Sequence, residues 1–439
     1  MRERLHWLAM HGVVRVFAGA AARRGDPQGR LIADPAVRAN PVPFLEELRP
    51  LGPLIRCRAS LLTVDHGVVH ELLRSDDFRV IELGAGLPGP LRRLEERTRT
   101  GLLHPLRPPS LLAVEPPEHT RYRRTVSSVF TTRAVTTLRQ RVRQTADELL
   151  DALVADAPGG GGAVDIVDRY CARLPVAVIS DILGVPERDR VRVLEFGELA
   201  APSLDVGLSW PQYRRVERGL AGFNTWLGEH INRLRTDPGD NLMSDLIRIS
   251  EADSQLDDEE LRAVAGLVLA AGFETTVNLL GNGIRLLMDA PDQLAVLREH
   301  PEHWPTAVEE ILRLDSPVQM SARTARTDTE VAGTPVARGE IVLLSLAGAN
   351  RDPEVFSDPH RFDVTRPNAG RHLSFSGGRH FCLGAALARA EGEVGLAAFF
   401  DRFPDVRAAA PGTRRDTRVL RGWSHLPVLL GPARSPAVR

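Results

Sequence analysis

Residues 375–384 read Phe-Ser-Gly-Gly-Arg-His-Phe-Cys-Leu-Gly, and a run with good helix-forming composition, Ala385 to Phe400, follows directly. This order predicts an extended, glycine-containing turn that delivers Cys382 to the start of a helix. Unpaired amide N–H groups and the positive end of the helix dipole lower the pKa of a thiol placed there and favour the thiolate. Gly378 permits a tight turn, and Gly384 lets a flat group approach the backbone. The simpler alternative is a buried structural cysteine.

Outward from this stretch, helical periodicity dominates the middle of the chain. Helices are predicted over 119–130, 134–154, 166–183, 189–199, 211–235, 241–250, 258–289, 292–299 and 302–313. Strand-like runs are few and short: Leu54–Arg58, Leu61–Asp65, Thr329–Val331 and Ile341–Leu346. The sequence shows no internal repeat and no convincing domain linker. We therefore expect a mainly α fold with small β-sheets, built as a single domain over residues 1–439.

The composition argues against several classes of protein. The 439 residues carry 56 basic and 57 acidic side chains, a balance that disfavours a nucleic-acid-binding protein. The sequence contains no lysine, so every one of these basic residues is arginine. Three scattered cysteines, Cys57, Cys171 and Cys382, are too few for a disulfide framework. A reducing compartment, and hence a cytoplasmic location, is the simplest interpretation.

Two segments differ from the central helical region. Residues 1–25 include an amphipathic stretch, Trp7 to Ala22, that is too short to span a bilayer. We expect a helix docked on the body of the protein and no transmembrane segment, with loose contact to a membrane surface as the alternative. Residues 81–118 are rich in glycine and proline and show little periodicity. Long irregular loops are usually lids or binding loops, so this segment is the expected substrate-access region.

The spacing F-x-x-G-x-x-x-C-x-G, with Ala388 six residues after the cysteine, resembles the signature of the cytochromes P-450, the haem-thiolate monooxygenases, in their soluble bacterial form. The resemblance implies one large haem-thiolate fold that binds haem b, with Cys382 as the ligand of the iron. In this stretch, the residues implied to bind haem are Phe375, Gly378, His380, Cys382 and Gly384. His380 matches a position that bonds a haem propionate. Ser376 departs from the pattern, because the family usually has glycine there.

Two more motifs resemble the family's propionate-binding segments. The sequence Glu-Pro-Pro-Glu-His-Thr-Arg-Tyr-Arg over residues 115–123 places His119 and Arg123 four residues apart, on one helix face. Arg323 precedes the predicted strand Thr329–Val331 and occupies the position of another propionate arginine. The resemblance implies that His119, Arg123 and Arg323 bind the haem together with His380.

A structural network is implied behind the haem. Glu310 and Arg313 are three residues apart on a predicted helix and can pair on one face. Such a pair matches the E-x-x-R motif of the family, which is completed by an arginine from a later irregular segment. Arg361, within residues 358–363, is the expected third member. We assign Glu310, Arg313 and Arg361 to folding and haem retention.

The predicted helix from Asp257 to Ala290 carries the expected catalytic residues. Asp257 and Glu260 can form a capping box at its start, and Pro291 stops it. Its middle, residues 270–276, reads Ala-Ala-Gly-Phe-Glu-Thr-Thr, so an acid and a hydroxyl lie inside an apolar helix.

Two neighbouring residues of this helix are the expected catalytic pair. Glu274 shares a stripe with apolar residues, and the hydroxyl of Thr275 can bond the carbonyl of Ala271 and open a local groove in the helix. The pair resembles the family's oxygen-activation motif, which implies that Thr275 assists oxygen activation and that Glu274 delivers protons. Peroxide-only chemistry is the less favoured alternative, because peroxygenases of the family replace this pair.

The resemblance also locates the substrate pocket. By resemblance its walls come from residues 81–112, 190–230, 267–275, 318–322 and 423–425. Gln319, Ser321 and His425 are possible polar anchors in otherwise apolar walls. We expect a small hydrophobic substrate, either free or bound to a carrier.

Electrons must come from another protein, because the chain has no flavin or nicotinamide fingerprint and no cysteine-rich iron–sulfur run. The expected donor is an acidic ferredoxin or flavodoxin that is reduced by an NAD(P)H-dependent reductase. Arg124, Arg379 and Arg389 are the candidate docking residues. The protein itself is expected to be a monomer.

Two alternatives to oxygen insertion stay open. One is an oxidase of the same family that couples phenols or cleaves C–C bonds. The other is a haem-thiolate sensor or binding protein without turnover, against which the acid and alcohol of the distal helix count.

Overall fold

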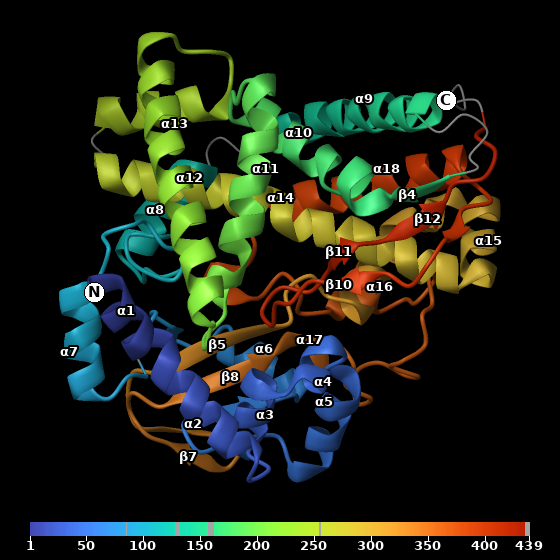
Figure 1. Ribbon diagram of the computed structural model, residues 1–439. Coiled ribbons are helices and arrows are strands. Elements are labelled where there is room, and N and C mark those ends of the chain that lie inside the picture. The colour runs from blue at the N-terminus through green and yellow to red at the C-terminus, as the bar shows by residue number, and fades with distance from the viewer. Residues whose placement is uncertain (85, 128–131, 157–161, 254–255, 435–439) are drawn as a thin grey trace.

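The computed structural model describes residues 1–84, 86–127, 132–156, 162–253 and 256–434 (Figure 1). Its α-helices are α1 (Arg2–Trp7), α2 (Val13–Ala22), α3 (Pro27–Ala33), α4 (Pro35–Ala39), α5 (Val42–Leu48), α6 (His66–Leu72), α7 (Gly89–Thr98), α8 (Glu118–Ser127), α9 (Thr132–Asp156), α10 (Arg173–Ile182), α11 (Arg190–Ala200), α12 (Trp210–Thr236), α13 (Leu242–Asp253), α14 (Asp258–Asp289), α15 (Pro291–Glu299), α16 (Trp304–Leu314), α17 (Leu346–Ala349) and α18 (Ala385–Arg402). Each helix predicted between residues 119 and 313 has a counterpart here, so the mainly α prediction is confirmed.

The strands are short and form small sheets. They are β1 (Ile55–Arg56), β2 (Leu61–Thr63), β3 (Phe78–Val80), β4 (Ala163–Asp165), β5 (Met320–Ala325), β6 (Thr329–Val331), β7 (Thr334–Val336), β8 (Ile341–Ser345), β9 (Arg407–Ala408), β10 (Thr413–Arg414), β11 (Trp423–His425) and β12 (Pro427–Leu429). The largest sheet has the order β1-β2-β8-β5-β3, in which β2 and β8 are parallel and the other pairs antiparallel. All four predicted strands are present. β1 is shorter than expected at both ends, β2 and β8 are shorter at their C-terminal ends, and β6 has the predicted bounds.

The long helix α14 crosses the middle of the molecule, above strands β5 and β8 of the largest sheet in the view of Figure 1. It begins as predicted: the Asp257 carboxylate accepts the Glu260 N–H at 2.8 Å, and the Glu260 carboxylate accepts the Asp257 N–H at 2.9 Å. By length and composition it could cross a membrane, but 67% of its most apolar window is buried inside the protein. It therefore behaves as the core helix around which α10, α12, α16 and α18 pack.

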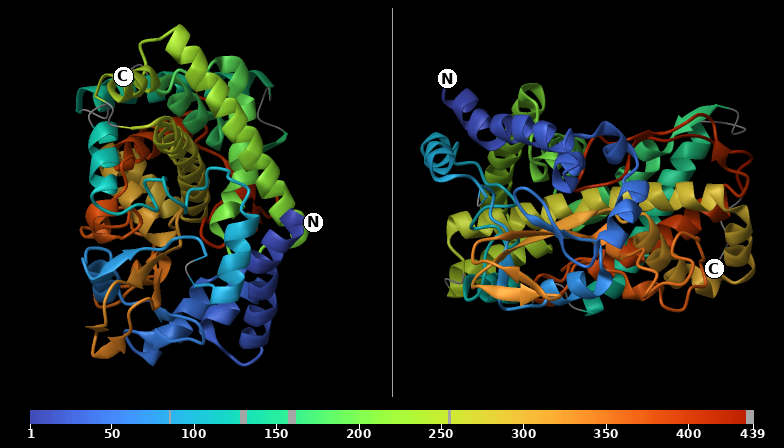
Figure 2. Two further views of the ribbon diagram at one scale, coloured as in Figure 1. Left: turned by 90° about the vertical axis from the view of Figure 1, so that its left-hand side faces the viewer. Right: turned by 90° about the horizontal axis from the view of Figure 1, so that it is seen from below.

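The N-terminal segment forms a helix with a defect rather than one uninterrupted helix. A π-helical turn, Leu8–Gly12, joins α1 to α2. The segment contacts α3, α7 and α12 along one side of the molecule (Figures 1 and 2). Two side chains fix it to one loop: Trp7 Nε1 donates to the Leu208 carbonyl and Arg15 to the Gly207 carbonyl, each at 2.9 Å.

Residues 81–118 are less irregular than the sequence indicated. They contain the ten-residue helix α7, so the expectation of a largely unstructured stretch is wrong there. The helix is held by Glu95, which is buried and pairs with Arg99 at 3.2 Å and with Arg107 at 2.5 Å. The glycine and proline residues that flank α7 obscure its helical periodicity in the sequence. In addition, Arg107, which pairs with Glu95 and stabilises the helix, lies outside it.

Candidate functional site

Cys382 lies between a short 3₁₀ turn, Gly378–His380, and the start of α18. Its N–H donates to the Phe375 carbonyl at 2.9 Å, which closes the turn over the preceding residues. The turn requires glycine at 378, where φ is +61° and a Cβ would lie 2.6 Å from the Leu73 carbonyl oxygen. The sequence therefore folds this stretch into the extended turn that was predicted, with its cysteine at a helix N-terminus.

The pKa of the Cys382 thiol is raised, whereas the sequence predicted a lowered pKa. Loss of hydration raises the pKa of Cys382, although the Gly384 amide and the guanidinium groups of Arg123 and Arg389 act in the opposite direction. The prediction of a lowered pKa is wrong for the protein groups alone, because desolvation outweighs the helix terminus. A bound metal ion would add the positive charge that deprotonates a coordinating thiol.

Cys382 is exposed towards a cavity of about 890 Å³. The α14 residues Ala271, Glu274 and Thr275 also line this cavity, and so does Gly384. A Cβ at Gly384 would meet no heavy atom within 4 Å, so a flat group has room against the backbone there.

Three nitrogen atoms in the cavity that Cys382 lines suit an anionic group. His119 Nε2, His380 Nε2 and Arg323 Nη2 are buried and have no hydrogen-bond partner, and their side chains line the cavity. Burial lowers the pKa of Arg323 to about 10, and burial together with nearby His119 and Arg323 lowers the pKa of His380 to about 3. The described residues thus fit haem b: a thiol for its iron, a space for a flat ring and unpartnered donors for its propionates.

The parts of this cradle come from distant segments. His119 lies on α8 with its ring centroid 4.3 Å from that of His380. Arg323 lies on β5, where its Nη1 donates to Ser321 Oγ at 3.1 Å and to the Ala322 carbonyl at 2.9 Å. Arg123, one turn after His119, is close enough to Cys382 for its charge to be felt by the thiol. The structure thus brings together the four residues that the sequence singled out.

The helix α14 contributes Glu274 and Thr275 to the lining of the same cavity. Thr275 Oγ donates to the Ala271 carbonyl at 3.0 Å as predicted, while the helix stays continuous. Glu274 is 4% exposed, and neither of its carboxylate oxygens has a hydrogen-bond partner. Burial raises the pKa of Glu274, and the nearby charge of Arg415 lowers it.

Arg415 was missed by the sequence reasoning. Its Nη1 lies 3.0 Å from Glu274 Oε1, and both side chains are nearly inaccessible. The residue follows β10, in a C-terminal hairpin where its N–H donates to the Gly422 carbonyl at 3.1 Å and its Nε to the Trp423 carbonyl at 3.3 Å. No local signal marks Arg415, because the pair joins segments that are 141 positions apart.

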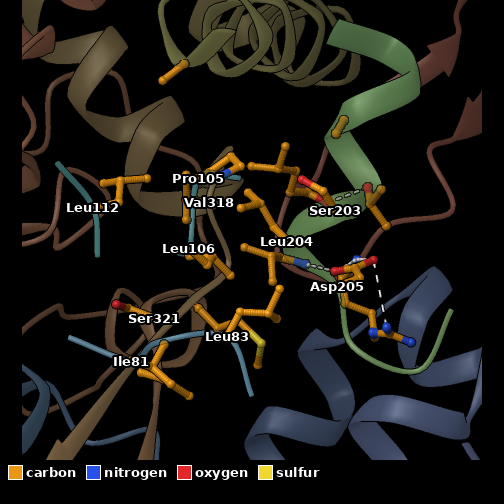
Figure 3. Close-up of a pocket in the computed structure, with 18 of the residues that line it drawn as sticks. Ile81, Leu83, Pro105, Leu106, Leu112, Ser203, Leu204, Asp205, Val318 and Ser321 are labelled. Carbon is orange, nitrogen blue, oxygen red and sulfur yellow. Dashed lines mark hydrogen bonds and ion pairs between the residues drawn. The ribbon is translucent and has the colours of Figure 1, made fainter. Parts of the chain in front are cut away.

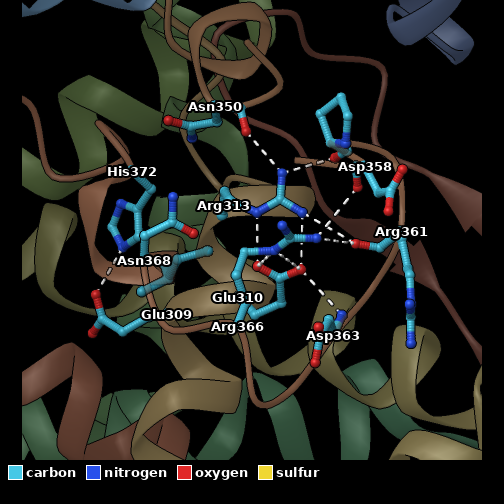
Figure 4. A network of polar contacts seen from close by, with 12 residues as sticks. Glu309, Glu310, Arg313, Asn350, Asp358, Arg361, Asp363, Arg366, Asn368 and His372 are labelled. Atoms are coloured by element: carbon cyan, nitrogen blue, oxygen red, sulfur yellow. Dashed lines mark hydrogen bonds and ion pairs between the residues drawn. The ribbon is translucent and has the colours of Figure 1, made fainter. Parts of the chain in front are cut away.

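Behind Cys382, a buried network surrounds Glu310 (Figure 4). Arg313 donates from Nε to Glu310 Oε2 at 2.7 Å and from Nη2 to Oε1 at 2.8 Å, and both side chains are 0% exposed. Arg366 Nε lies 3.1 Å from both carboxylate oxygens, and the Asp363 N–H donates to Oε1 at 3.1 Å. Glu310 is thus bonded on both oxygens.

The third member of this network is Arg366, so the prediction of Arg361 is wrong. The side chain of Arg361 is exposed and points away from Glu310 (Figure 4). Arg361 contributes its carbonyl, which accepts from Arg313 at 3.2 Å and from Arg366 at 3.0 Å. The motif spacing predicted the correct irregular segment next to Glu310. It did not distinguish Arg361 from Arg366, five residues later, as the side chain that points inward.

Asn350 connects this network to the turn that holds Cys382. Its carbonyl accepts from Arg313 Nη1 at 2.9 Å, its Oδ1 accepts the Leu373 N–H at 2.7 Å, and its Nδ2 donates to Ser374 Oγ at 2.9 Å. Ser374 Oγ in turn donates to the Leu312 carbonyl at 2.8 Å. The network therefore fixes the position of the cysteine turn.

The outer walls of the cavity agree with four of the five predicted segments. Residues 80–84, 103–112, 193–227, 262–279 and 317–323 all contribute, as Figure 3 shows for Ile81, Leu106, Ser203 and Val318. The prediction for 423–425 is wrong, because residues 417–421 line the cavity there instead. His425 is exposed and pairs with Asp165 at 2.6 Å. Gln319 and Ser321 do line the cavity, as predicted.

The three arginines proposed for docking differ in their surroundings. Arg379 pairs with Asp76 and Glu115, and Arg389 pairs with Glu309 at 2.5 Å. Arg124 is exposed. Intramolecular partners thus offset part of the charge at two of the three positions.

Comparisons with known proteins agree on one family. A family model described as cytochrome P450 matches residues 305–407. The chain is 68% identical over 438 residues to a Mycobacterium tuberculosis protein named cytochrome P450 140, covering 99% of both chains. It is 44% identical over 322 residues to the 6-deoxyerythronolide B hydroxylase of Saccharopolyspora erythraea, covering 72% of this chain and 76% of that one. Among solved structures, ligand-free CYP164A2 of Mycobacterium smegmatis matches with a TM-score of 0.79 and 33% identity, covering 90% of this chain and 97% of that chain.

Proposed function

The chain belongs to the cytochrome P450 family and is a monooxygenase that binds haem b, and we propose that it inserts one oxygen atom of O2 into a hydrophobic substrate. One observation carries the proposal: Cys382, Glu274 and Thr275 line the same cavity, whose outer walls are mostly apolar. A thiol for the iron and an acid–alcohol pair in the same cavity are what oxygen insertion at a haem requires of the protein.

In this proposal Cys382 holds the haem iron, and His119, Arg123, Arg323 and His380 hold the propionates. When bound, a thiolate-ligated haem supplies the activation of O2, because the thiolate pushes electron density onto the iron and favours O–O cleavage. The unpartnered nitrogens of His119, Arg323 and His380 support this assignment, since buried donors without acceptors are costly in a folded protein.

Glu274 and Thr275 are assigned to proton delivery. Burial raises the pKa of Glu274, so its carboxyl can hold a proton at a higher pH than a free glutamic acid. Arg415 opposes this shift and keeps the carboxylate form accessible, which lets Glu274 both take up and release a proton. The Thr275 hydroxyl lies one residue further along α14 and is held by the Ala271 carbonyl at 3.0 Å. It can pass a proton towards the haem side of the cavity.

We assign the electron supply to an external ferredoxin or flavodoxin and its NAD(P)H-dependent reductase. Arg124 is the preferred docking residue, because it is exposed whereas Arg379 and Arg389 have acidic partners. Reversing the charge at Arg124 should slow reduction and flatten its dependence on salt, while reversal at Arg389 should do less. An unchanged salt dependence in the Arg124→Glu variant would remove Arg124 from the docking surface.

The proposed reaction is tested by turnover under ¹⁸O2. The haem-loaded protein is first titrated with a panel of apolar compounds, and a shift of the haem absorption band from low to high spin selects the compounds to be oxidised. Mass spectrometry of the products should show one ¹⁸O atom per product molecule. An oxidised product without ¹⁸O would favour phenol coupling or C–C cleavage, and binding without any product would favour a sensor.

A further inference from the structure

The N-terminal helix α2 forms part of the cavity wall. Neither the sequence motifs nor the proposed chemistry predicts this role for it. Six residues of one helical stripe line the cavity: Met10, Val13, Val14, Phe17, Ala18 and Ala21. Their spacing of three or four residues is that of a single face of α2 and the turn before it. Val16, on the opposite face, is 75% exposed and does not line the cavity.

This wall is fixed to the body by specific contacts. The Leu208 N–H donates to His11 Nδ1 at 3.3 Å, and burial lowers the pKa of His11 to about 3, so the imidazole is neutral and can accept. Trp7 and Arg15 donate to the carbonyls of the same loop, residues 207–208. On the other side α3 packs so closely that a Cβ at Gly29 would lie 2.5 Å from the Ala22 nitrogen. The helix is therefore a built part of the chamber.

Three charged side chains that line the cavity here, Asp205, Arg107 and Arg38, form ion pairs within the protein. Asp205 accepts the N–H groups of Arg418 and Val419, both at 3.0 Å, and lies 3.9 Å from the Arg418 guanidinium. Arg107 pairs with Glu95 at 2.5 Å, and Arg38 pairs with Asp416 at 2.6 Å. A ligand with a charged group at its far end would have to compete with these pairs, whereas a hydrocarbon end would not.

The direction of the chamber follows from the haem site. Haem would take the end at Cys382, which leaves for substrate the space between Thr275 and α2. The walls of that space include Phe17, Leu83 and Leu106. Figure 3 shows the last two. Its occupant must therefore reach from the haem towards the N-terminal helix and be apolar along the way.

We propose that α2 is the far wall of the substrate chamber and sets the longest substrate that the enzyme accepts: an elongated molecule with a hydrocarbon end opposite the oxidised position. This inference rests on the proposed function, since it takes the Cys382 end as the reactive end. It makes Val14, Phe17 and Ala18 specificity-determining residues.

The test uses the haem-loaded full chain and a series of straight-chain 1-alkanols from six to sixteen carbons, with binding measured by calorimetry. Affinity of the unmodified protein should rise about fourfold per added methylene until the chain reaches α2, and then level off. In Val14→Trp and Ala18→Trp the levelling should come at shorter chains, with at least a tenfold loss for the longest alkanols and little change for the shortest. Val16→Trp, on the outer face of the same helix, is the matched control and should follow the unmodified protein.

Three outcomes would overturn the proposal: no binding of any alkanol to the unmodified protein, equal losses at all chain lengths in Val14→Trp, or the same profile in Val14→Trp and Val16→Trp. If the tryptophan variants fold poorly, Phe17→Ala decides, because removing this ring should move the preferred chain length upward and an unmoved optimum rejects the wall. Binding that follows chain length without turnover would contradict the proposed function and leave the wall intact. Turnover together with the same chain-length profile in the unmodified protein and the α2 variants would support the proposed function and reject α2 as the far wall.

Discussion

Glu310 and Glu274 are both buried carboxylates on helices near the proposed haem site, yet their surroundings are opposite. Glu310 is 0% exposed and is bonded by Arg313, Arg366 and the Asp363 N–H. Glu274 is 4% exposed, has one ion pair with Arg415 and accepts no hydrogen bond. A buried charge is tolerated when it is fully bonded, and an incompletely bonded one changes protonation state instead. The first arrangement suits a structural role and the second suits proton transfer.

The largest expected effect is on the Glu310 side. Glu310→Gln leaves the buried guanidinium groups of Arg313 and Arg366 without their carboxylate, which should lower the free energy of unfolding by about 3–5 kcal/mol. Arg366→Ala removes one of these two arginines and should also destabilise the protein, by less than Glu310→Gln, because Arg313 stays bonded to Glu310. Urea unfolding of the haem-loaded protein measures the loss. Arg361→Ala is the control and should change stability by less than about 0.5 kcal/mol, because its side chain is exposed and its carbonyl is retained. Equal losses in Arg361→Ala and Arg366→Ala would contradict the assignment of Arg366 as the third member.

The same change at the other carboxylate should affect activity instead of stability. Glu274→Gln removes a proton donor and should slow product formation by about 10²-fold or more, a range typical for the loss of a general acid. Its free energy of unfolding should change less than that of Glu310→Gln, because Glu274 loses one ion pair with Arg415 and no hydrogen bond, whereas Glu310 loses its bonds to two arginines. Turnover assays and urea unfolding of the two variants, run in parallel, test this contrast. A Glu274→Gln protein that is as unstable as Glu310→Gln would mean that both acids are structural.

Thr275→Ala tests the alcohol of the pair. The variant should still consume reductant but release much of it as peroxide, since proton delivery and oxygen insertion are no longer linked. Product and peroxide, each measured against NAD(P)H consumed, give the result directly. An unchanged product yield would remove Thr275 from the proposed mechanism.

Arg415→Gln sharpens the comparison through pH. A carboxyl with a raised pKa binds more protons when folded, so its contribution to stability is present below its ordinary pKa of 4.5 and is lost as pH rises towards the folded pKa. Removing the Arg415 charge raises the pKa of Glu274 further, which should extend this loss to higher pH and move the pH–rate profile in the same direction. Arg414→Gln is the neighbouring control, because Arg414 pairs with Asp315 at 2.7 Å. A profile that moves equally in both variants would show that Glu274 is not the titrating group.

Local sequence motifs predicted one partner of Glu310, Arg313, but no partner of Glu274. The pair of Glu310 and Arg313 follows from helical spacing, and so does the Thr275 bond to Ala271, because both lie within one turn of a helix. Arg366 and Arg415 could not be predicted, since each reaches its acid from an irregular segment whose path depends on the whole fold. The wall formed by α2 was missed for the same reason: amphipathicity shows that a helix has an apolar face but not what that face covers.

The smallest expected effect concerns the turn that the Glu310 network supports. Ser376 has φ of +63° and Gly378 has φ of +61°, so two residues of one turn share the left-handed conformation and only one of them is glycine. An L-residue with a side chain pays about 1–2 kcal/mol there, while a glycine costs about 0.5–1 kcal/mol more in the unfolded chain. Ser376→Gly should therefore stabilise the haem-loaded protein slightly, by about 0.5–1 kcal/mol. Gly378→Ser is the converse, and because its Cβ would meet the Leu73 carbonyl at 2.6 Å it should destabilise the turn and loosen haem. Thermal unfolding together with haem release to excess apomyoglobin separates the two effects. A Ser376→Gly protein that loses haem faster would show that the serine itself helps to retain haem. The strained backbone at Ser376 would then have a functional role, although the neighbouring Glu310 network is fully hydrogen-bonded.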